Sequence, residues 1–89
     1  MTLHVLIVGG GKVGTYLAGL LLADGHTVKV VEGGKEEYRL MAAALPPEIV
    51  QFGNMTDPAV LEAAGIREAD VVAAVTRTDE TNLVITSLA

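Results

Sequence analysis

Short, largely apolar runs alternate with longer segments rich in alanine and leucine along this chain. Residues 3–8, 27–31, 48–52 and 69–75 form the short runs, and their β-branched content is typical of strands buried on both faces of a sheet. In residues 13–24 and 36–44, apolar positions recur every three or four residues, which predicts helices. The pattern therefore predicts parallel strands connected by helices.

The second half of the chain carries weaker helix signals. Asp57 and Pro58 predict the start of a third helix, as N-cap and first helical residue, and this helix is expected to end near residues 64–65. Thr78 or Asp79 is expected to cap a fourth helix. That helix should run to the end of the chain, because the apolar positions of residues 83–89 have helical spacing.

Strand–helix alternation of this kind predicts an α/β fold, a Rossmann-like doubly wound parallel sheet with strand order 3-2-1-4. Residues 1–89 suffice for one domain. Such sheets usually continue beyond a fourth strand. We therefore expect a fold truncated after about four strands and incomplete at its C-terminus, with the fourth strand as an exposed apolar edge.

Composition and charge narrow the classes of function. Only 3% of the residues are aromatic while 51% are hydrophobic, which favours a parallel sheet over an antiparallel sandwich. The absence of cysteine excludes disulfides and thiolate metal sites. A net charge of −5 argues against a nucleic-acid partner. No apolar run reaches the roughly 18 residues of a membrane span, so a cytoplasmic location is expected.

The glycines after the first predicted strand provide the main chemical signal. Residues 9–14 match the pattern G-x-G-x-x-G between a strand and a helix. Gly9 would allow a tight turn, Gly11 a close approach of a pyrophosphate to the backbone, and Gly14 close packing of the helix. A plain turn without a ligand is the alternative. Lys12 could add charge near the phosphates or could be a solvated lysine.

Glu32, at the end of the second predicted strand, supports the nucleotide interpretation. A carboxylate about twenty residues after the glycines can accept hydrogen bonds from ribose hydroxyls, and it would repel a 2′-phosphate. This favours NAD(H) or an adenine nucleotide over NADP(H). An ordinary exposed glutamate in a turn is the alternative. His4 and His26 have no motif partners, and no nucleophile or metal motif is present, so we expect a binding module and not an enzyme.

An ordered series of short motifs carries a family resemblance that covers essentially the whole chain. They are residues 53–61 (GNMTDPAVL), 64–66 (AGI), 69–70 (AD), 74–76 (AVT) and 79–82 (DETN). Together with the glycine loop, this series closely resembles the RCK domain, also called the KTN or Trk-type N-terminal NAD-binding domain. The Gly33–Gly34 pair departs from the charged pair common in that family, which puts the contacts on the adenine side in doubt.

The resemblance implies a cytoplasmic regulatory domain that binds NAD(H), ATP, ADP or AMP. Such domains control a membrane potassium channel or a Trk/Ktr-type uptake system at the inner face of the membrane, and they assemble as homodimers or larger homo-oligomers. The implied binding residues are Gly9, Gly11, Lys12, Val13 and Gly14 for phosphates, Glu32 for ribose, Asn54, Met55 and Thr56 for adenine, and Thr76 for phosphate or a second ribose. Residues 79–82 could contact the ligand or only cap a helix. The N-terminal fragment of an NAD-dependent dehydrogenase is the alternative function.

Overall fold

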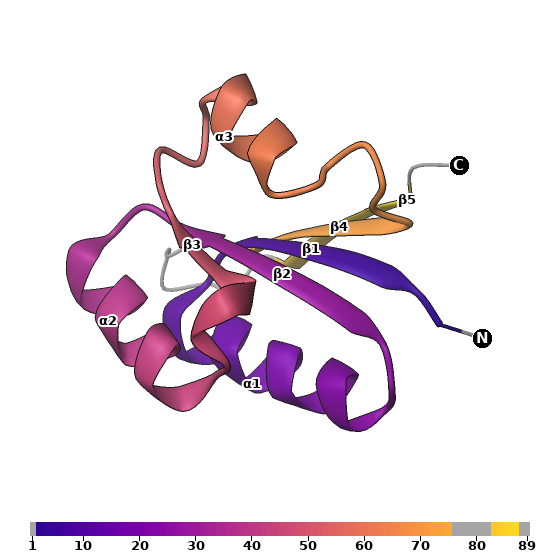
Figure 1. The fold of residues 1–89 in the computed structure, drawn as a ribbon, viewed down its shortest axis with the longest axis horizontal. Coiled ribbons are helices and arrows are strands. Elements are labelled where there is room, and N and C mark those ends of the chain that lie inside the picture. The colour runs from indigo at the N-terminus through magenta and orange to yellow at the C-terminus, as the bar shows by residue number, and fades with distance from the viewer. Residues whose placement is uncertain (1, 76–82, 88–89) are drawn as a thin grey trace.

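A computed structural model describes residues 2–75 and 83–87 as one α/β unit (Figure 1). The strands are β1 (His4–Gly9), β2 (Thr27–Glu32), β3 (Val50–Phe52), β4 (Val71–Val75) and β5 (Leu83–Ser87). The helices are α1 (Gly11–Ala23), α2 (Lys35–Ala44) and α3 (Pro58–Ala63), with a 3₁₀ turn at Pro47–Ile49. The turn takes up part of the run predicted as the third strand, so β3 is shorter than the sequence indicated.

The strands form one sheet with the order β3-β2-β1-β4-β5. The first four strands pair in parallel, which confirms the predicted order 3-2-1-4. The register aligns the carboxyl ends of these strands. Val8 pairs with Val31, Gly9 with Val75, and Glu32 with Phe52. Gly9 and Glu32 therefore lie level with each other on neighbouring strands.

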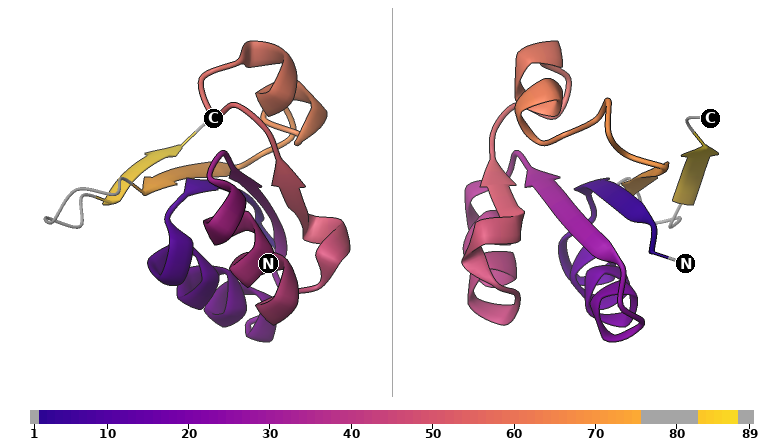
Figure 2. Two further views of the ribbon diagram at one scale, coloured as in Figure 1. Left: turned by 90° about the vertical axis from the view of Figure 1, so that its left-hand side faces the viewer. Right: turned by 45° about the vertical axis from the view of Figure 1, so that its right-hand side comes forward.

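Two layers of helices cover the sheet (Figures 1 and 2). Helices α1 and α2 pack on one face, where the larger cluster of buried side chains includes Ile7, Val30 and Met41, all fully buried. Helix α3 and its flanking turns lie on the other face over a smaller cluster that contains Leu6 and Val31. From β1 to β3 each new strand adds on one side of β1, and β4 then adds on the other side. The order of the strands therefore reverses between β1 and β4, where the connecting helices also change from one face of the sheet to the other (Figure 2).

The end of the chain differs from the prediction of a fourth helix. Residues 83–87 form strand β5, which pairs antiparallel with β4, so β4 is not the edge of the sheet. The sequence Leu-Val-Ile-Thr-Ser is rich in β-branched residues, which fit a pleated strand better than a helix. The edge of β4 offers backbone hydrogen-bond partners that residues 83–87 use as a strand. The spacing of apolar residues within so short a segment does not reveal such a partner. Residues 78 and 79, the predicted caps, lie outside the described residues.

The third helix follows its prediction closely. Asp57 is its N-cap, and the Asp57 carboxylate accepts a hydrogen bond of 2.9 Å from the amide of Ala59. Pro58 occupies the first helical turn, where its missing N–H costs nothing. This short helix returns the chain from β3 across the sheet to β4. The turn at residues 53–56 that precedes it lies beside the ends of β1 and β2, where Met55 approaches Gly9 and Gly33.

Candidate functional site

The first turn after β1 consists of three consecutive glycines with positive φ angles of 78°, 106° and 47° at Gly9, Gly10 and Gly11. Residues with side chains rarely adopt such angles. A Cβ atom at Gly9 would lie 2.9 Å from the carbonyl oxygen of Val75, and one at Gly10 would lie 2.9 Å from the amide nitrogen of Gly14. Gly9 and Gly10 are therefore required for the turn to pack against β4 and α1.

Gly11 and Gly14 have different surroundings. A Cβ at Gly14 would lie 2.6 Å from the carbonyl oxygen of Gly9, so this glycine lets α1 lie directly against the end of β1. A Cβ at Gly11 would meet nothing closer than the Cγ of Glu37, at 3.6 Å. Of the four glycines in residues 9–14, Gly11 is the one whose backbone can be approached from outside.

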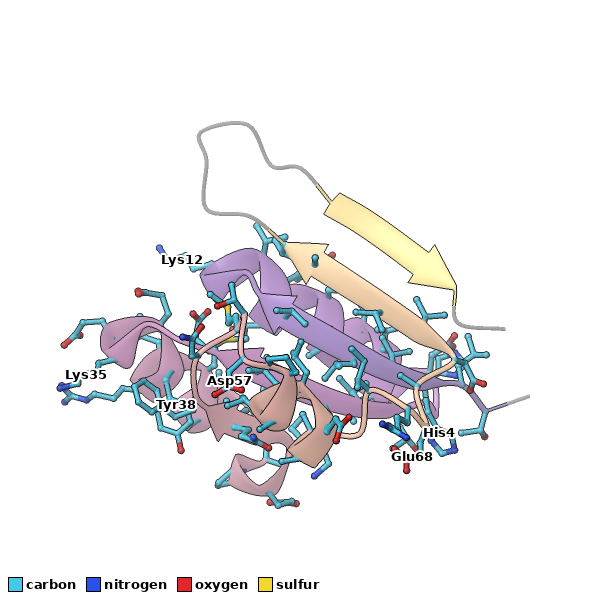
Figure 3. All side chains as sticks on the ribbon, turned by 90° about the horizontal axis from the view of Figure 1, so that it is seen from above. His4, Lys12, Lys35, Tyr38, Asp57 and Glu68 are labelled. Atoms are coloured by element: carbon cyan, nitrogen blue, oxygen red, sulfur yellow. The ribbon has the colours of Figure 1, made fainter. Side chains whose placement is uncertain are left out.

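Helix α1 begins at this open position. Its N-cap is Gly10, which has no side chain to accept hydrogen bonds from the first amides of the helix. Those amides and the helix dipole favour a negatively charged group at this end. Lys12 and Val13 are exposed on the first turn, and Lys12 lies at the edge of the molecule where the parallel strands end (Figure 3). The start of α1 can therefore hold an anion such as a phosphate.

Glu32 lies beside this turn and is completely buried, with 0% of its surface exposed. Its Oε2 atom accepts hydrogen bonds from the amides of Gly33, at 2.9 Å, and Gly34, at 3.0 Å. Its Oε1 atom accepts a longer bond of 3.4 Å from the amide of Gly11. The alternative of an exposed glutamate in a turn is therefore wrong. Glu32 connects the glycine turn to the turn that precedes α2.

The turn after β3 forms one wall of a hollow at the carboxyl ends of the parallel strands. The hollow has a volume of about 490 Å³ and is lined by Gly33, Gly34, Phe52, Gly53, Asn54, Met55 and Thr56. The side-chain oxygen of Asn54 accepts hydrogen bonds from the amide of Thr56, at 2.9 Å, and from its hydroxyl, at 2.7 Å. These bonds hold the backbone of the turn in one shape. A planar ring system could lie against this wall.

Met55 extends from that turn toward the glycines. Its Sδ lies 3.1 Å from the position that a Cβ of Gly9 would occupy, and its Cε lies 3.5 Å from the corresponding position at Gly33. The side chain is half-buried and packs against the cluster around Leu6 and Val31. Met55 thus fills the space between the carboxyl ends of β1 and β2.

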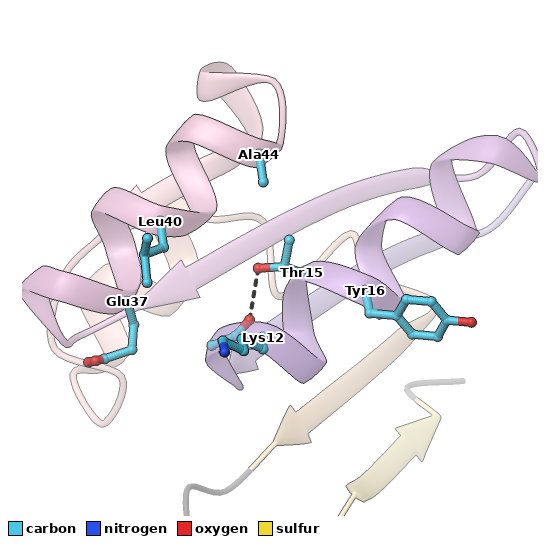
Figure 4. A pocket seen from close by; sticks show the side chains of 7 residues that line it. Lys12, Thr15, Tyr16, Glu37, Leu40 and Ala44 are labelled. Carbon is cyan, nitrogen blue, oxygen red and sulfur yellow. Dashed lines mark hydrogen bonds between the residues drawn. The ribbon is translucent and has the colours of Figure 1, made fainter.

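A second cavity, of about 540 Å³, lies between α1 and α2 and was not predicted from the sequence (Figure 4). It is lined by Gly11, Lys12, Thr15, Tyr16, Glu37, Leu40 and Ala44. The hydroxyl of Thr15 donates a hydrogen bond of 2.8 Å to the carbonyl of Gly11 and so faces the helix backbone. Two of the lining residues, Tyr16 on α1 and Leu40 on α2, are large exposed hydrophobic residues.

The two histidines lie at the opposite end of the sheet, away from the glycine turn. The Nδ1 atom of His26 accepts a hydrogen bond of 3.0 Å from the amide of Leu3, which connects the turn before β2 to the start of β1. His4 is exposed at the same end (Figure 3). Neither histidine is near Glu32 or the start of α1. The hydrogen bond of His26 is that of a structural residue.

Thr76, which the family resemblance implies as a ligand contact, lies outside the described residues, as do residues 79–82, for which a ligand contact and a helix cap were both open. In the described ranges, no group of three or more histidine or acidic side chains could hold a metal ion. Within those same ranges, no helix has the length and apolar character needed to cross a bilayer. The structure brings together the glycine turn, Glu32 and residues 54–56.

Comparison with known proteins identifies the family. The family model of the TrkA-N domain matches residues 5–89. A Trk system potassium uptake protein TrkA homolog from Methanothermobacter thermautotrophicus is 46% identical over 81 residues, and one from Pyrococcus abyssi is 34% identical over 87 residues. The Trk system potassium uptake protein TrkA of Vibrio alginolyticus is 33% identical over 81 residues.

These matches cover nearly all of the chain but only part of each relative. They span 91%, 98% and 91% of the chain, respectively, and 37%, 38% and 18% of the three relatives. The similarity therefore concerns one segment of proteins that are considerably longer. The glycine turn, the buried acid at the end of β2 and the turn after β3 all lie within the matched residues. The chain belongs to the TrkA-N domain family.

Proposed function

We propose that this chain is a nucleotide-binding regulatory domain of a Trk-type potassium uptake system. The observation that carries the proposal is the meeting of two groups at the carboxyl ends of β1 and β2. The amide of Gly11, at the open start of α1, lies 3.4 Å from a carboxylate oxygen of Glu32. The proposed anion site and the proposed ribose-binding acid are therefore adjacent, as the phosphate and ribose of one nucleotide are.

The residues fit an adenine nucleotide or NAD(H) in the following arrangement. The backbone from Gly9 to Gly14 would hold phosphates, with Lys12 and Val13 on the first turn of α1, and Glu32 would accept bonds from the ribose. Asn54, Met55 and Thr56 would border the adenine in the hollow of about 490 Å³. Thr76 is proposed as a further contact on the basis of the family resemblance alone. The negative charge of Glu32 disfavours a 2′-phosphate.

The potassium-uptake part of the proposal rests on the relatives. Proteins named as Trk system potassium uptake proteins share this segment, and they do not favour the alternative of a dehydrogenase fragment. The domain would act in the cytoplasm on a membrane transporter subunit, as a homodimer or larger homo-oligomer, and would bind nucleotide without turnover. Residues 1–89 would form the nucleotide-binding part of a longer protein. Regulation then requires that the nucleotide bind one arrangement of the domains more tightly than another.

Calorimetric titration with NAD⁺, NADH, ATP, ADP and AMP tests the proposal. We expect saturable binding of at least one of these and no sustained hydride transfer or hydrolysis. The variant Gly11→Val should abolish binding, because its side chain would occupy the open approach to the backbone. Gly25→Val is the matched control. Gly25 also has a positive φ, of 88°, and open space around it, but lies in the turn between α1 and β2. Unaltered affinity in Gly11→Val would refute the site.

A further inference from the structure

Two helices begin near the carboxyl ends of the parallel strands, and their first turns differ in charge. Helix α1 has no acidic residue in its first turn, whereas α2 has Glu36 and Glu37. Both helices have glycine N-caps, Gly10 and Gly34, which carry no side chain to accept hydrogen bonds from the first amides. The acidic residues therefore distinguish the two places where a phosphate could meet the start of a helix.

The carboxylate of Glu37 lies against the start of its own helix. A Cβ at Gly34 would overlap Oε1 of Glu37, and it would lie 3.0 Å from Cδ and 3.1 Å from Oε2. The helix dipole and the first amides favour a negative charge in this position. The start of α2 thus already holds a carboxylate of the chain itself, which would repel a phosphate. The start of α1 is the place where a phosphate would bind.

The side chain of Glu37 also passes beside the start of α1. Its Cγ lies 3.6 Å from the position that a Cβ of Gly11 would occupy, and the carboxylate carbon is one bond beyond Cγ. Gly11 is the glycine whose backbone can be approached from outside. A phosphate on this backbone would therefore lie within about 8 Å of the carboxylate, the range over which charges interact at physiological ionic strength.

The charged side chains around the backbone of Gly11 disfavour a highly charged ligand. Lys12 from α1 and Glu37 from α2 both line the cavity between these helices, so their opposite charges offset each other (Figure 4). The buried carboxylate of Glu32 adds a negative charge, with Oε1 at 3.4 Å from the amide of Gly11. Lys35 is in the same turn of α2 as Glu37 but lines a different hollow. Each additional phosphoryl group on a nucleotide would therefore be repelled more strongly.

We propose that Glu37 determines which nucleotides the site accepts, given the nucleotide-binding function proposed above. Its carboxylate lowers the affinity of the start of α1 for phosphate, and the loss grows with the charge of the phosphate groups. NAD⁺ and NADH carry phosphodiesters, which have less charge than a terminal phosphate, and AMP has one phosphate group. The site therefore prefers NAD⁺, NADH or AMP to ADP and ATP.

Calorimetric titration of the parent protein, Glu37→Gln and Glu36→Gln tests this selectivity, with NAD⁺, NADH, AMP, ADP and ATP as probes. The buffer contains about 0.1 M salt and EDTA, so that the probes keep their full charge. We expect Glu37→Gln to bind AMP and NAD⁺ about threefold and ATP about tenfold more tightly, because one negative charge within about 8 Å of the phosphates is lost. Glutamine preserves the shape of the side chain, and urea unfolding of each variant checks that the fold is retained.

Glu36→Gln is the matched control. It removes the same charge from the same turn of α2, but Glu36 is exposed, forms an ion pair of 3.4 Å with Arg39 and does not line the cavity at Gly11. This variant should change every affinity by less than about twofold. Repeating the titrations in about 1 M salt separates charge from shape, because screening should reduce the gain of Glu37→Gln to less than about twofold.

The results also separate the selectivity from the proposed function. No gain in Glu37→Gln, an equal gain for AMP and ATP, or a gain that persists in 1 M salt would overturn the selectivity and leave nucleotide binding intact. Weaker binding by Glu37→Gln would also overturn it, because Glu37 would then be a favourable contact for the ligand. No binding of any probe by any of the three proteins would overturn the proposed function, and the selectivity with it.

Discussion

The buried carboxylate of Glu32 makes a measurable prediction about stability that is independent of any ligand. Replacing Glu32 with alanine removes the acceptor for three backbone amides, those of Gly11, Gly33 and Gly34. Replacing it with glutamine keeps one oxygen, which can still accept from Gly33 and Gly34. The amide nitrogen of the glutamine then faces the amide of Gly11, and the charge is lost.

The expected losses in the free energy of unfolding follow from the lengths of these hydrogen bonds. Each of the two short bonds to a charged acceptor contributes about 1.5 kcal/mol, and the long bond from Gly11 contributes less. Water entering the space left by alanine recovers part of the loss. We therefore expect Glu32→Ala to lower the free energy of unfolding by about 2–4 kcal/mol and Glu32→Gln by about 1–2 kcal/mol. A domain of this length has a total of roughly 4–13 kcal/mol.

Urea unfolding followed by far-ultraviolet circular dichroism provides the measurement. With a slope of about 1–1.5 kcal/mol per molar urea, Glu32→Ala should lower the midpoint by about 1.3–4 M and Glu32→Gln by about 0.7–2 M. Glu48→Gln is the matched control, since Glu48 is exposed and should shift the free energy by less than about 0.5 kcal/mol. If both Glu32 variants matched this control, the carboxylate could not be buried and bonded as described.

Substitutions at four further positions test the fold through the same measurement. Gly14→Ala should destabilise by about 1–3 kcal/mol, because its Cβ would lie 2.6 Å from the carbonyl oxygen of Gly9. Gly19→Ala, in the same helix with nothing within 4 Å, should stabilise by about 0.5–1 kcal/mol, and a loss there would contradict the open surroundings. Asp57→Ala should cost about 1 kcal/mol through the lost cap of α3, and Asp57→Asn much less. Leu6→Ala, on the central strand with 1% exposure, should cost about 2–5 kcal/mol, and a smaller loss would argue against a packed core on the α3 face.

Local patterns were sufficient to predict most elements of the fold. The helices α1, α2 and α3 and the strands β1, β2 and β4 lie where periodicity and turn residues placed them, within a few residues at their ends. Asp57 and Pro58 were sufficient to locate the start of α3, because a cap acts on amides two or three residues away. The order of the parallel strands followed from the handedness of strand–helix–strand connections.

The predictions that failed depended on contacts between distant parts of the chain. Residues 83–87 have a helical spacing of apolar positions, yet β4 offers them a paired edge and they form β5. The cavity between α1 and α2 arises only when two amphipathic helices lie side by side. Neither the partner of a strand nor the gap between two helices is encoded by the spacing of residues within one segment.

Within the candidate site, Glu32 likewise separates what the local sequence predicts from what contacts between distant segments decide. The sequence by itself determined that an acid ends the second strand, about twenty residues after a glycine-rich turn. Only the tertiary structure decided that this acid is fully buried and bonded to the amides of Gly11, Gly33 and Gly34. Residue types and their spacing specify the conformation of the backbone only locally. Burial and access depend on which segments, here residues 9–11, 32–34 and 53–56, the sheet brings to the same edge.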